Sequence, residues 1–354
     1  MRKCLSLFSA LFLLVSCYEE VLIPVGEGEP VPVMNAQFNN LEPVHVVSLS
    51  LSRLSSLTPL EGAEVQVYVN GSWRADAVEE EPSYHAARYA FEASWEAGDE
   101  IQIVARKGSY SVSAVTTVPY PVEIEAVDTA SVQMSVWGEM EDYVQMKVRF
   151  HDLPGPSWYG INARCSESCD YLDGEGLPIP GYSVADMDWA IPLETGFDPI
   201  VSEGSTLSGG DWTSFFAVED EYHVFSDVPF SGQDCSIRVL ADTWSFFLPD
   251  KNYGIYYPEG MMDEDYGELS QYPRRVRRRC ILCLRSLGLA QYHYLKALSN
   301  LEAFGTDVSF LIEPTTLPSN VEGGIGFVGV ETVSEIDVAV FEKEYSPLDN
   351  LYYN

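Results

Sequence analysis

The sequence is poor in basic residues. Its 354 residues include 20 lysines and arginines against 54 aspartates and glutamates, which gives a formal net charge of −34. A surface this acidic repels the phosphates of nucleic acids and the head groups of anionic lipids. The composition therefore predicts no nucleic-acid partner, and no attachment to a membrane through basic residues.

The common catalytic motifs are missing as well. None of the five histidines begins an HExxH motif, and no GxSxG, SxxK or P-loop pattern occurs. The acidic segments 170–176 and 263–265 carry oxygen ligands that suit calcium, but neither has the spacing of an EF-hand loop. We therefore expect a protein that is not an enzyme and that uses no metal and no cofactor.

Long apolar runs are absent except at the N-terminus. A basic pair at 2–3 precedes an apolar run at 4–15, which has the length of a secretory signal and is too short to span a bilayer. Residues 14–17, Leu-Val-Ser-Cys, resemble the bacterial lipobox, in which the cysteine is acylated on its thiol and becomes the new N-terminus. We therefore predict a lipoprotein signal peptide at 1–16 and lipidation of Cys17.

The residues that follow the predicted anchor are acidic and then rich in proline and glycine. Tyr-Glu-Glu at 18–20 resembles the surface-export signal of Bacteroidota lipoproteins. Three prolines and two glycines between 21 and 34 are typical of an extended linker. We expect residues 17–34 to form a lipidated tether, and the protein to be lipid-anchored at the outer membrane and exposed on the cell surface.

Residues 35–119 show the alternation of apolar and polar residues that is typical of strands with one buried face. Asn70 and Gly71 provide the positive φ angles of a tight hairpin turn. Six or seven short strands in this length predict an immunoglobulin-like or transthyretin-like β-sandwich. Pro119 and Pro121 mark its end, because proline interrupts a ladder of backbone hydrogen bonds.

Residues 122–354 predict a larger β-rich domain with longer loops, so the whole protein is expected to be mainly β. The spacing of apolar residues predicts one amphipathic helix at 290–304. Residues 165–215 are rich in Gly, Pro, Ser and Asp, and we expect them to be the longest irregular stretch. Strands are expected at 143–150, 158–164, 222–225, 235–241 and 277–286.

Five of the twenty basic residues lie within six positions near the C-terminus. One interpretation is an exposed patch that docks a partner. The other is a strand whose arginines pair with carboxylates of neighbouring strands, with the first two arginines outside the ladder. The residues are Arg274, Arg275, Arg277, Arg278 and Arg279.

Seven cysteines are present, and five of them remain once Cys4 leaves with the signal peptide and Cys17 is acylated. The four-residue separation of Cys165 and Cys169, at what we expect to be a loop edge, permits a small disulfide. The CxxC pair at 280–283 falls in a predicted strand, where the two side chains point to opposite faces. We expect buried free thiols there.

Three further patterns have weaker functional interpretations. Residues 324–329 match GxGxxG, but they precede a strand-like segment, so we expect the glycines to permit a bulge or a close strand contact. Thr129, in Asp-Thr-Ala, resembles the Bacteroidota O-glycosylation sequon. The aromatic residues at 244–257 could stack on a ligand or fill a core.

An ordered set of segments carries a family resemblance: 62–65 (Gly-Ala-Glu-Val), 222–227 (Tyr-His-Val-Phe-Ser-Asp), 282–287, 292–296 (Tyr-His-Tyr-Leu-Lys) and 319–329. Together with the lipobox, they resemble the Bacteroidota lipoproteins grouped as domain of unknown function 4249. Members of that family are typically encoded beside TonB-dependent outer-membrane receptors, and the resemblance implies no catalytic residues. The arginine cluster and the paired cysteines depart from the family pattern, so any role they have is particular to this chain.

The resemblance implies a TonB-dependent outer-membrane receptor as the partner. We therefore expect a non-enzymatic accessory or ligand-binding partner of such a transporter. The alternative is a structural or adhesive β-sandwich protein of the cell surface.

Overall fold

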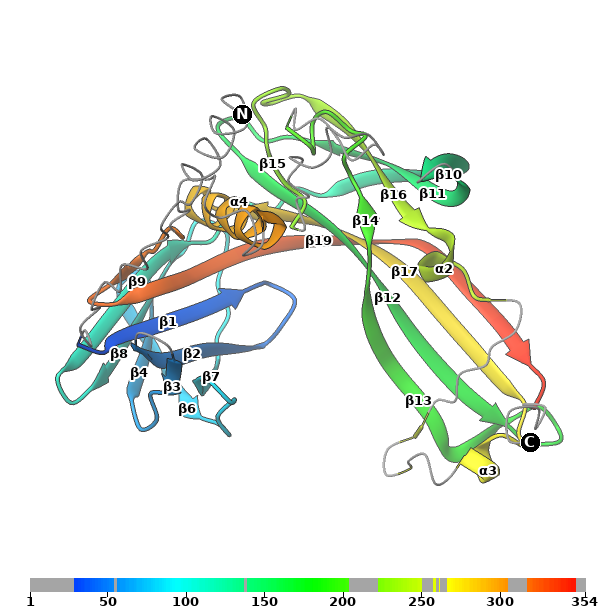
Figure 1. Cartoon of the computed structure of the whole chain (residues 1–354), viewed down its shortest axis with the longest axis horizontal. Coiled ribbons are helices and arrows are strands. Elements are labelled where there is room, and N and C mark those ends of the chain that lie inside the picture. Colours follow the sequence, from blue (N-terminus) through cyan, green and yellow to red (C-terminus); the bar gives the residue numbers. More distant parts are fainter. Residues whose placement is uncertain are drawn as a thin grey trace, which may run out of the picture.

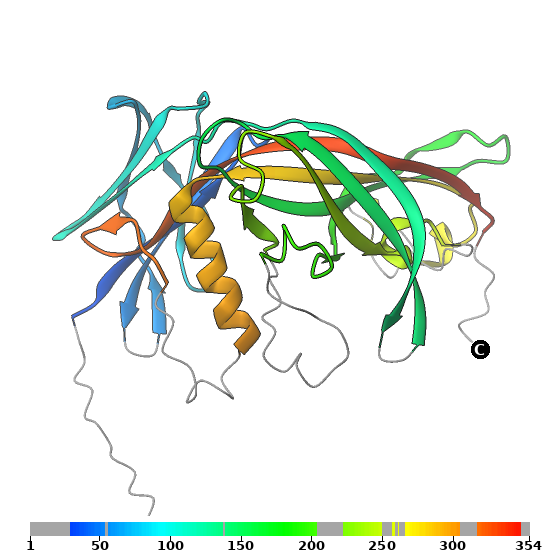
Figure 2. The same cartoon turned by 90° about the horizontal axis from the view of Figure 1, so that it is seen from above.

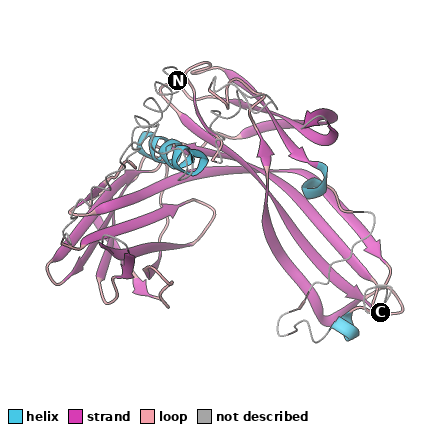
Figure 3. Ribbon diagram, viewed as in Figure 1, coloured by secondary structure: helices cyan, strands magenta, loops and turns pink. Residues whose placement is uncertain are grey.

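The computed structural model describes residues 29–53, 56–136, 139–203, 222–249, 257–258, 261, 266–304 and 317–347. Most of these residues lie in strands, so the protein is mainly β, as predicted (Figure 3). The predicted signal peptide at 1–16, Cys17 and the acidic segment 263–265 lie outside the described residues. In the part of the chain that is described, no helix is long and apolar enough to span a membrane.

One strand, β19 (Ile325–Tyr345), runs through both halves of the molecule and has 21 residues. Its first section pairs in parallel with β1 (Val31–Phe38), and from Glu331 onward it pairs antiparallel with β17 (Arg274–Leu287). In Figure 1 it is the orange to red strand that leaves the N-terminal half and ends at the opposite side. A single ten-stranded sheet therefore joins the two halves.

The N-terminal half, called the sandwich below, has two facing sheets. One is the section β19-β1-β2-β7-β6 of the ten-stranded sheet, with β3 paired to β2, and the other has the order β18-β9-β8-β4-β5. The strands are β2 (Val44–Arg53), β3 (Ser56–Pro59), β4 (Glu64–Val69), β5 (Ser72–Asp76), β6 (Val78–Glu79), β7 (Ala87–Glu92), β8 (Glu100–Lys107), β9 (Tyr110–Thr117) and β18 (Val321–Glu322).

The core of the sandwich is apolar and follows the predicted alternation. Every second residue of β4 is buried, and the same holds for most of β8. Asn70 and Gly71 have φ angles of 52° and 73° and close the hairpin between β4 and β5, as predicted. The fully buried side chains of Met34, Leu49 and Ile103 pack between the two sheets.

The sandwich extends beyond the predicted range of 35–119. β1 begins at Val31, so residues 31–34 of the predicted tether belong to a strand. Val321 and Val328, from the far end of the chain, lie in the same apolar core. The sequence pattern could not show this contribution, because more than 200 residues separate β9 from β18.

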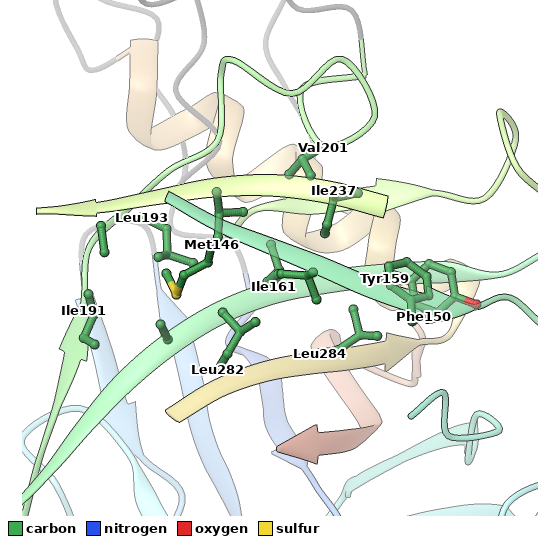
Figure 4. Close-up of a cluster of buried hydrophobic side chains, with 14 of the residues drawn as sticks. Met146, Phe150, Tyr159, Ile161, Ile191, Leu193, Val201, Ile237, Leu282 and Leu284 are labelled. Atoms are coloured by element: carbon green, nitrogen blue, oxygen red, sulfur yellow. The ribbon is translucent and has the colours of Figure 1, made fainter. Parts of the chain in front are cut away.

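The second half places a four-stranded sheet, with the order β10-β11-β16-β14, against the middle of β12, β17 and β19. Figure 4 shows Met146 and Ile237 of the first layer pointing toward Leu282 and Leu284 of the second. The elements are β10 (Ile124–Val136), β11 (Glu139–His151), β12 (Trp158–Leu172), β13 (Pro178–Ile191), β14 (Leu193–Glu194), β15 (Val224–Ser226), β16 (Asp234–Asp242) and helix α2 (Thr243–Phe246).

Beyond this core, β12, β13, β17 and β19 continue together as a four-stranded ribbon, called the arm below (Figure 1). Helix α3 (Tyr266–Leu269) lies at its tip. A small apolar cluster there contains the buried Tyr171, Val276 and Tyr345. The arm thus has its own minor core, separate from the main cluster of the second half.

Helix α4 (Leu289–Phe304) forms where the sequence predicts it and packs at the junction of the two halves (Figure 2). Its Tyr294 ring stacks on Phe327 of β19 at a centroid distance of 4.4 Å. Gln291 donates to the carboxylate of Glu331, which is also 3.4 Å from Arg285. Burial raises the pKa of Glu331.

Residues 165–215 are more regular than predicted. β12 continues to Leu172, and β13 follows after a turn in which Asp173 accepts hydrogen bonds from the backbone N–H groups of Glu175 and Leu177. The prolines at 178 and 180 are tolerated because β13 is an edge strand with one unpaired side. The prediction of a long loop is therefore wrong for this part, because turn-forming residues also occur on an edge strand. Residues 204–221 lie outside the described residues.

Candidate functional site: the arginine strand

All five clustered arginines lie in β17, with β12 on one side and β19 on the other. Arg274 is already in register with Tyr171 and Tyr345, and Arg275 with Asp170 and Glu344. The expectation that the first two arginines lie outside the ladder is therefore wrong. Pro273 does not prevent this, because it stands before the first paired residue of the strand.

Alternation along β17 separates the arginines between two faces. Arg274 and Arg278 point inward together with the apolar Val276, and both are buried. Arg275, Arg277 and Arg279 point to the opposite face, called the outer face below. A docking patch of all five arginines is excluded, because two of them are inside the protein.

The buried Arg278 holds together three elements. Its Nε lies 2.7 Å from Oε2 of Glu167 on β12, and the two side chains are only 9% and 2% exposed. Its Nη1 donates to the carbonyl of Phe247 at 2.6 Å, just after α2, and its guanidinium lies 5.2 Å from the Trp189 ring centroid. A buried ion pair of this kind needs such additional hydrogen bonds to offset the desolvation of both charges.

The outer face carries exposed ion pairs between neighbouring strands. Arg275 lies 2.7 Å from Glu344, and Arg279 lies 2.9 Å from Asp337. The hydrogen bond to Glu344 raises the pKa of Arg275 further above its ordinary value. These contacts match the paired-strand interpretation, in which carboxylates of β19 neutralise the arginines.

Arg277 is the exception on this face. It is exposed, and within the described residues it makes no ion pair, although Glu342 of β19 is its neighbour in register. A groove of about 310 Å³ lies beside it, lined by Ser166, Glu167, Ser168, Arg277, Arg279 and Asp337. A guanidinium next to two hydroxyl groups can bind a carboxylate or another small anionic group of a partner.

A second hollow, which the sequence did not indicate, lies at one end of the sandwich. Its volume is about 650 Å³, and residues 39–43 and 92–95 line it together with His45. The His45 ring stacks on Trp95 at 4.2 Å, and its Nε2 lies 3.2 Å from the carbonyl of Ala93. Burial lowers the pKa of His45. His45 and Trp95 come from different segments, so no local motif connects them.

The predicted disulfide between Cys165 and Cys169 is wrong. Both residues lie inside β12, no bond joins them, and neither lies at a loop edge. Four residues of extended strand span about 13 Å, whereas the Cα atoms of a disulfide are usually about 4.4–6.8 Å apart. Cys280 and Cys283 are buried on opposite faces of β17, as predicted, and no bond joins them to each other.

The other sequence candidates are dispersed through the fold. Thr129 is exposed on β10, where it is accessible, and its glycosylation stays a prediction. Trp244 is 82% exposed, whereas Phe246 is buried in the main core. Among the described residues, no group of three or more histidine, cysteine, aspartate or glutamate side chains is placed to hold a metal ion.

The GxGxxG segment is not a nucleotide loop. Gly324 to Gly329 form the turn and the start of β19, and no helix begins there. Gly326 has a φ angle of 121°, and a Cβ atom at this position would collide with the carbonyl of Met34 on β1. The glycines therefore permit close strand contact, as predicted.

The fold and this site define a mainly β protein in which one long sheet joins a sandwich to a charged arm. The family described as Domain of unknown function (DUF4249) matches residues 18–337, which is most of the chain. The chain belongs to this family. No curated protein matches it.

Among solved structures, the chain is similar to one titled "Biofilm associated protein - BSP domain". The sequence identity is 8% and the TM-score is 0.15. The alignment covers 87% of this chain and 59% of that one.

Proposed function

We propose that the chain is a lipoprotein of the Bacteroidota type, anchored through Cys17 at the outer membrane and exposed on the cell surface. The observation that carries this proposal is the position of Cys17 between a short apolar run and an ordered body. β1 begins at Val31, so residues 18–30 connect the anchor to the body. These thirteen residues span at most about 45 Å when fully extended, which holds the body near the membrane surface.

We further propose that the body is a non-enzymatic accessory or ligand-binding partner of a TonB-dependent transporter. Membership of the DUF4249 family supports this role, through the family's usual association with such receptors. The outer face of the arm offers a contact surface, because Arg277 is exposed beside Ser166 and Ser168. Of the five arginines in the expected docking patch, only Arg277, with the groove beside it, remains available to a partner.

The anchor is tested by a Cys17→Ala variant. We expect the protein to leave the membrane fraction, because an acyl chain contributes about 0.8 kcal/mol per buried CH₂ and the variant has none. Cys4→Ala is the matched control, since this residue is removed with the predicted signal peptide and lipidation is unaffected. Membrane attachment of a correctly cleaved Cys17→Ala protein, verified by mass, would refute the lipoprotein proposal.

The partner is tested by mild cross-linking on intact cells, followed by purification of the lipoprotein. We expect a large outer-membrane receptor in the cross-linked product, and less of it with Arg277→Glu. Arg74→Glu, a charge reversal at another exposed arginine, on β5 of the sandwich, is the matched control. Recovery of assemblies of the lipoprotein alone would instead favour a structural or adhesive protein.

A further inference from the structure

Cys165 and Cys280 face each other across the ladder between β12 and β17. They are directly opposite in the antiparallel register, and their sulfur atoms are 3.8 Å apart. Directly opposite residues in such a pair have Cα atoms about 4.5 or 5.5 Å apart, and both values fit the range of about 4.4–6.8 Å found in disulfides. The backbone is therefore already placed for a bond, and side-chain rotation can close the remaining gap.

The other buried cysteines are not arranged in this way. Cys169 lies opposite Val276, and Cys235 lies opposite Phe150. Cys283 lies opposite Asn162 on β12. This geometry predicts that, of the five cysteines, only Cys165 and Cys280 form a disulfide with each other.

We propose that Cys165 and Cys280 form a disulfide that crosslinks β12 to β17 in the mature protein. The proposal rests on the export proposed above, because exported chains fold in an oxidising compartment. It assigns a covalent modification to two residues that are 115 positions apart in the sequence.

The oxidant is itself a disulfide, provided in the cell by a thiol oxidase and in vitro by oxidised glutathione. One cysteine thiolate attacks this disulfide and displaces one thiolate, and the second cysteine then attacks the mixed disulfide and releases the other. The two cysteines lose two protons and two electrons in total, and the oxidant becomes two thiols.

The pair reacts before the second half is fully packed. Both sulfur atoms are buried beneath α2, where Cys165 donates to the carbonyl of Ser245 at 3.1 Å and Cys280 to that of Phe246 at 3.2 Å. An oxidant cannot reach them in the folded protein. Arg278 also donates to the Ser245 carbonyl, at 3.4 Å, so this acceptor keeps a donor after the thiol protons are lost.

The test is refolding of the purified mature chain in reduced and oxidised glutathione. The product is then denatured without reductant, alkylated and weighed by mass spectrometry. We expect two fewer alkyl groups than in a sample that was reduced first. Cys165→Ser and Cys280→Ser should abolish this difference, whereas the matched controls Cys169→Ser and Cys283→Ser should preserve it.

Equal labelling of the reduced and unreduced wild-type protein would overturn the proposal, and so would a loss of two labels that persists in Cys165→Ser. Far-UV circular dichroism identifies variants that fail to fold, and Cys165→Ala and Cys280→Ala then replace them. The refolding result does not depend on where the cell places the protein. It therefore separates this proposal from the localisation, which the Cys17→Ala variant tests alone.

Discussion

The sandwich and the arm are both made of paired strands, but they bury different groups. The sandwich core contains apolar side chains from two facing sheets, with Leu49 and Ile103 fully buried. The arm is a single ribbon that carries a buried ion pair, Arg278 with Glu167, and a row of exposed ion pairs on its outer face. The sandwich is therefore stabilised mainly by burial of apolar area, and the arm depends more on correctly matched charges.

This difference predicts how each half responds when one side chain is removed. An apolar core loses the transfer free energy of the deleted atoms and gains a cavity. A buried ion pair that loses one partner leaves a charge without compensation in the interior, which is strongly unfavourable. Deletion of both partners of such a pair can be close to neutral, and an apolar core has no equivalent of this rescue.

The largest effect is expected for Arg278→Ala, which leaves the Glu167 carboxylate buried without its guanidinium. We expect a loss of about 3–5 kcal/mol in the free energy of unfolding, measured by urea denaturation. The double variant Arg278→Met with Glu167→Leu should recover most of this loss. For comparison, Ile103→Ala in the sandwich should cost about 2–5 kcal/mol.

Arg277→Ala, on the exposed face of the same strand, is the matched control and should change stability by about 0.5 kcal/mol or less. A double variant as unstable as Arg278→Ala would show that packing of the arginine, and not its charge, stabilises the arm. The arm would then be stabilised by packing, as the sandwich is, and not by matched charges.

The sequence predicted correctly those elements that are determined by residues close together in the chain. The alternation in Val65, Val67 and Val69, the Asn70-Gly71 turn and the periodicity of α4 each fix a structure within a few residues. The length of β12 and β13 was missed, because glycine and proline on an edge strand look like a loop. The use of β18 and β19 to complete the sandwich depends on long-range pairing, which no local pattern contains.

The second prediction concerns Gly326, near the start of β19, where this strand pairs with β1 in the sandwich. In Gly326→Ala, the positive φ angle of 121° and the contact with the Met34 carbonyl act together, so we expect a loss of about 3 kcal/mol. Gly71→Ala is the matched control, since its φ angle is 73° and a Cβ atom there meets no neighbour within 4 Å. It should cost only about 1–2 kcal/mol. Equal losses in the two variants would show that the β1–β19 contact is not constrained.

The candidate site was predicted only in part for the same physical reason. The sequence showed that the arginines are concentrated in one segment, and carboxylate pairing was one of the two interpretations. It could not identify Glu167, Asp337 and Glu344 as partners, because these residues are 58 to 111 positions away. The Cys165–Cys280 contact could not be predicted for the same reason, because 115 positions separate the two cysteines.

The third prediction concerns how the stability of the sandwich depends on pH. Burial lowers the pKa of His45 in the folded state, so the unfolded chain binds more protons below about pH 6.5. The stability that neutral His45 provides is present above that pH and is lost as the pH falls through the folded-state pKa. His45→Phe should remove this part of the slope between pH 8 and pH 5, and His85→Gln, on the sandwich surface, should not. Parallel curves for wild type and His45→Phe would contradict the assignment.

The smallest effect is expected on the outer face of the arm, where Arg279 and Asp337 are 46% and 44% exposed. Water screens this pair, and holding two mobile side chains in one geometry costs entropy, so Arg279→Gln should lower stability by only about 0–1 kcal/mol. The difference should shrink further in 1 M salt, because the screening length falls to about 3 Å. Urea denaturation at low and high salt measures both effects. A salt-independent loss near that of Arg278→Ala would mean that the outer pairs are coupled to the buried pair through the strand, and that the arm behaves as one charge network.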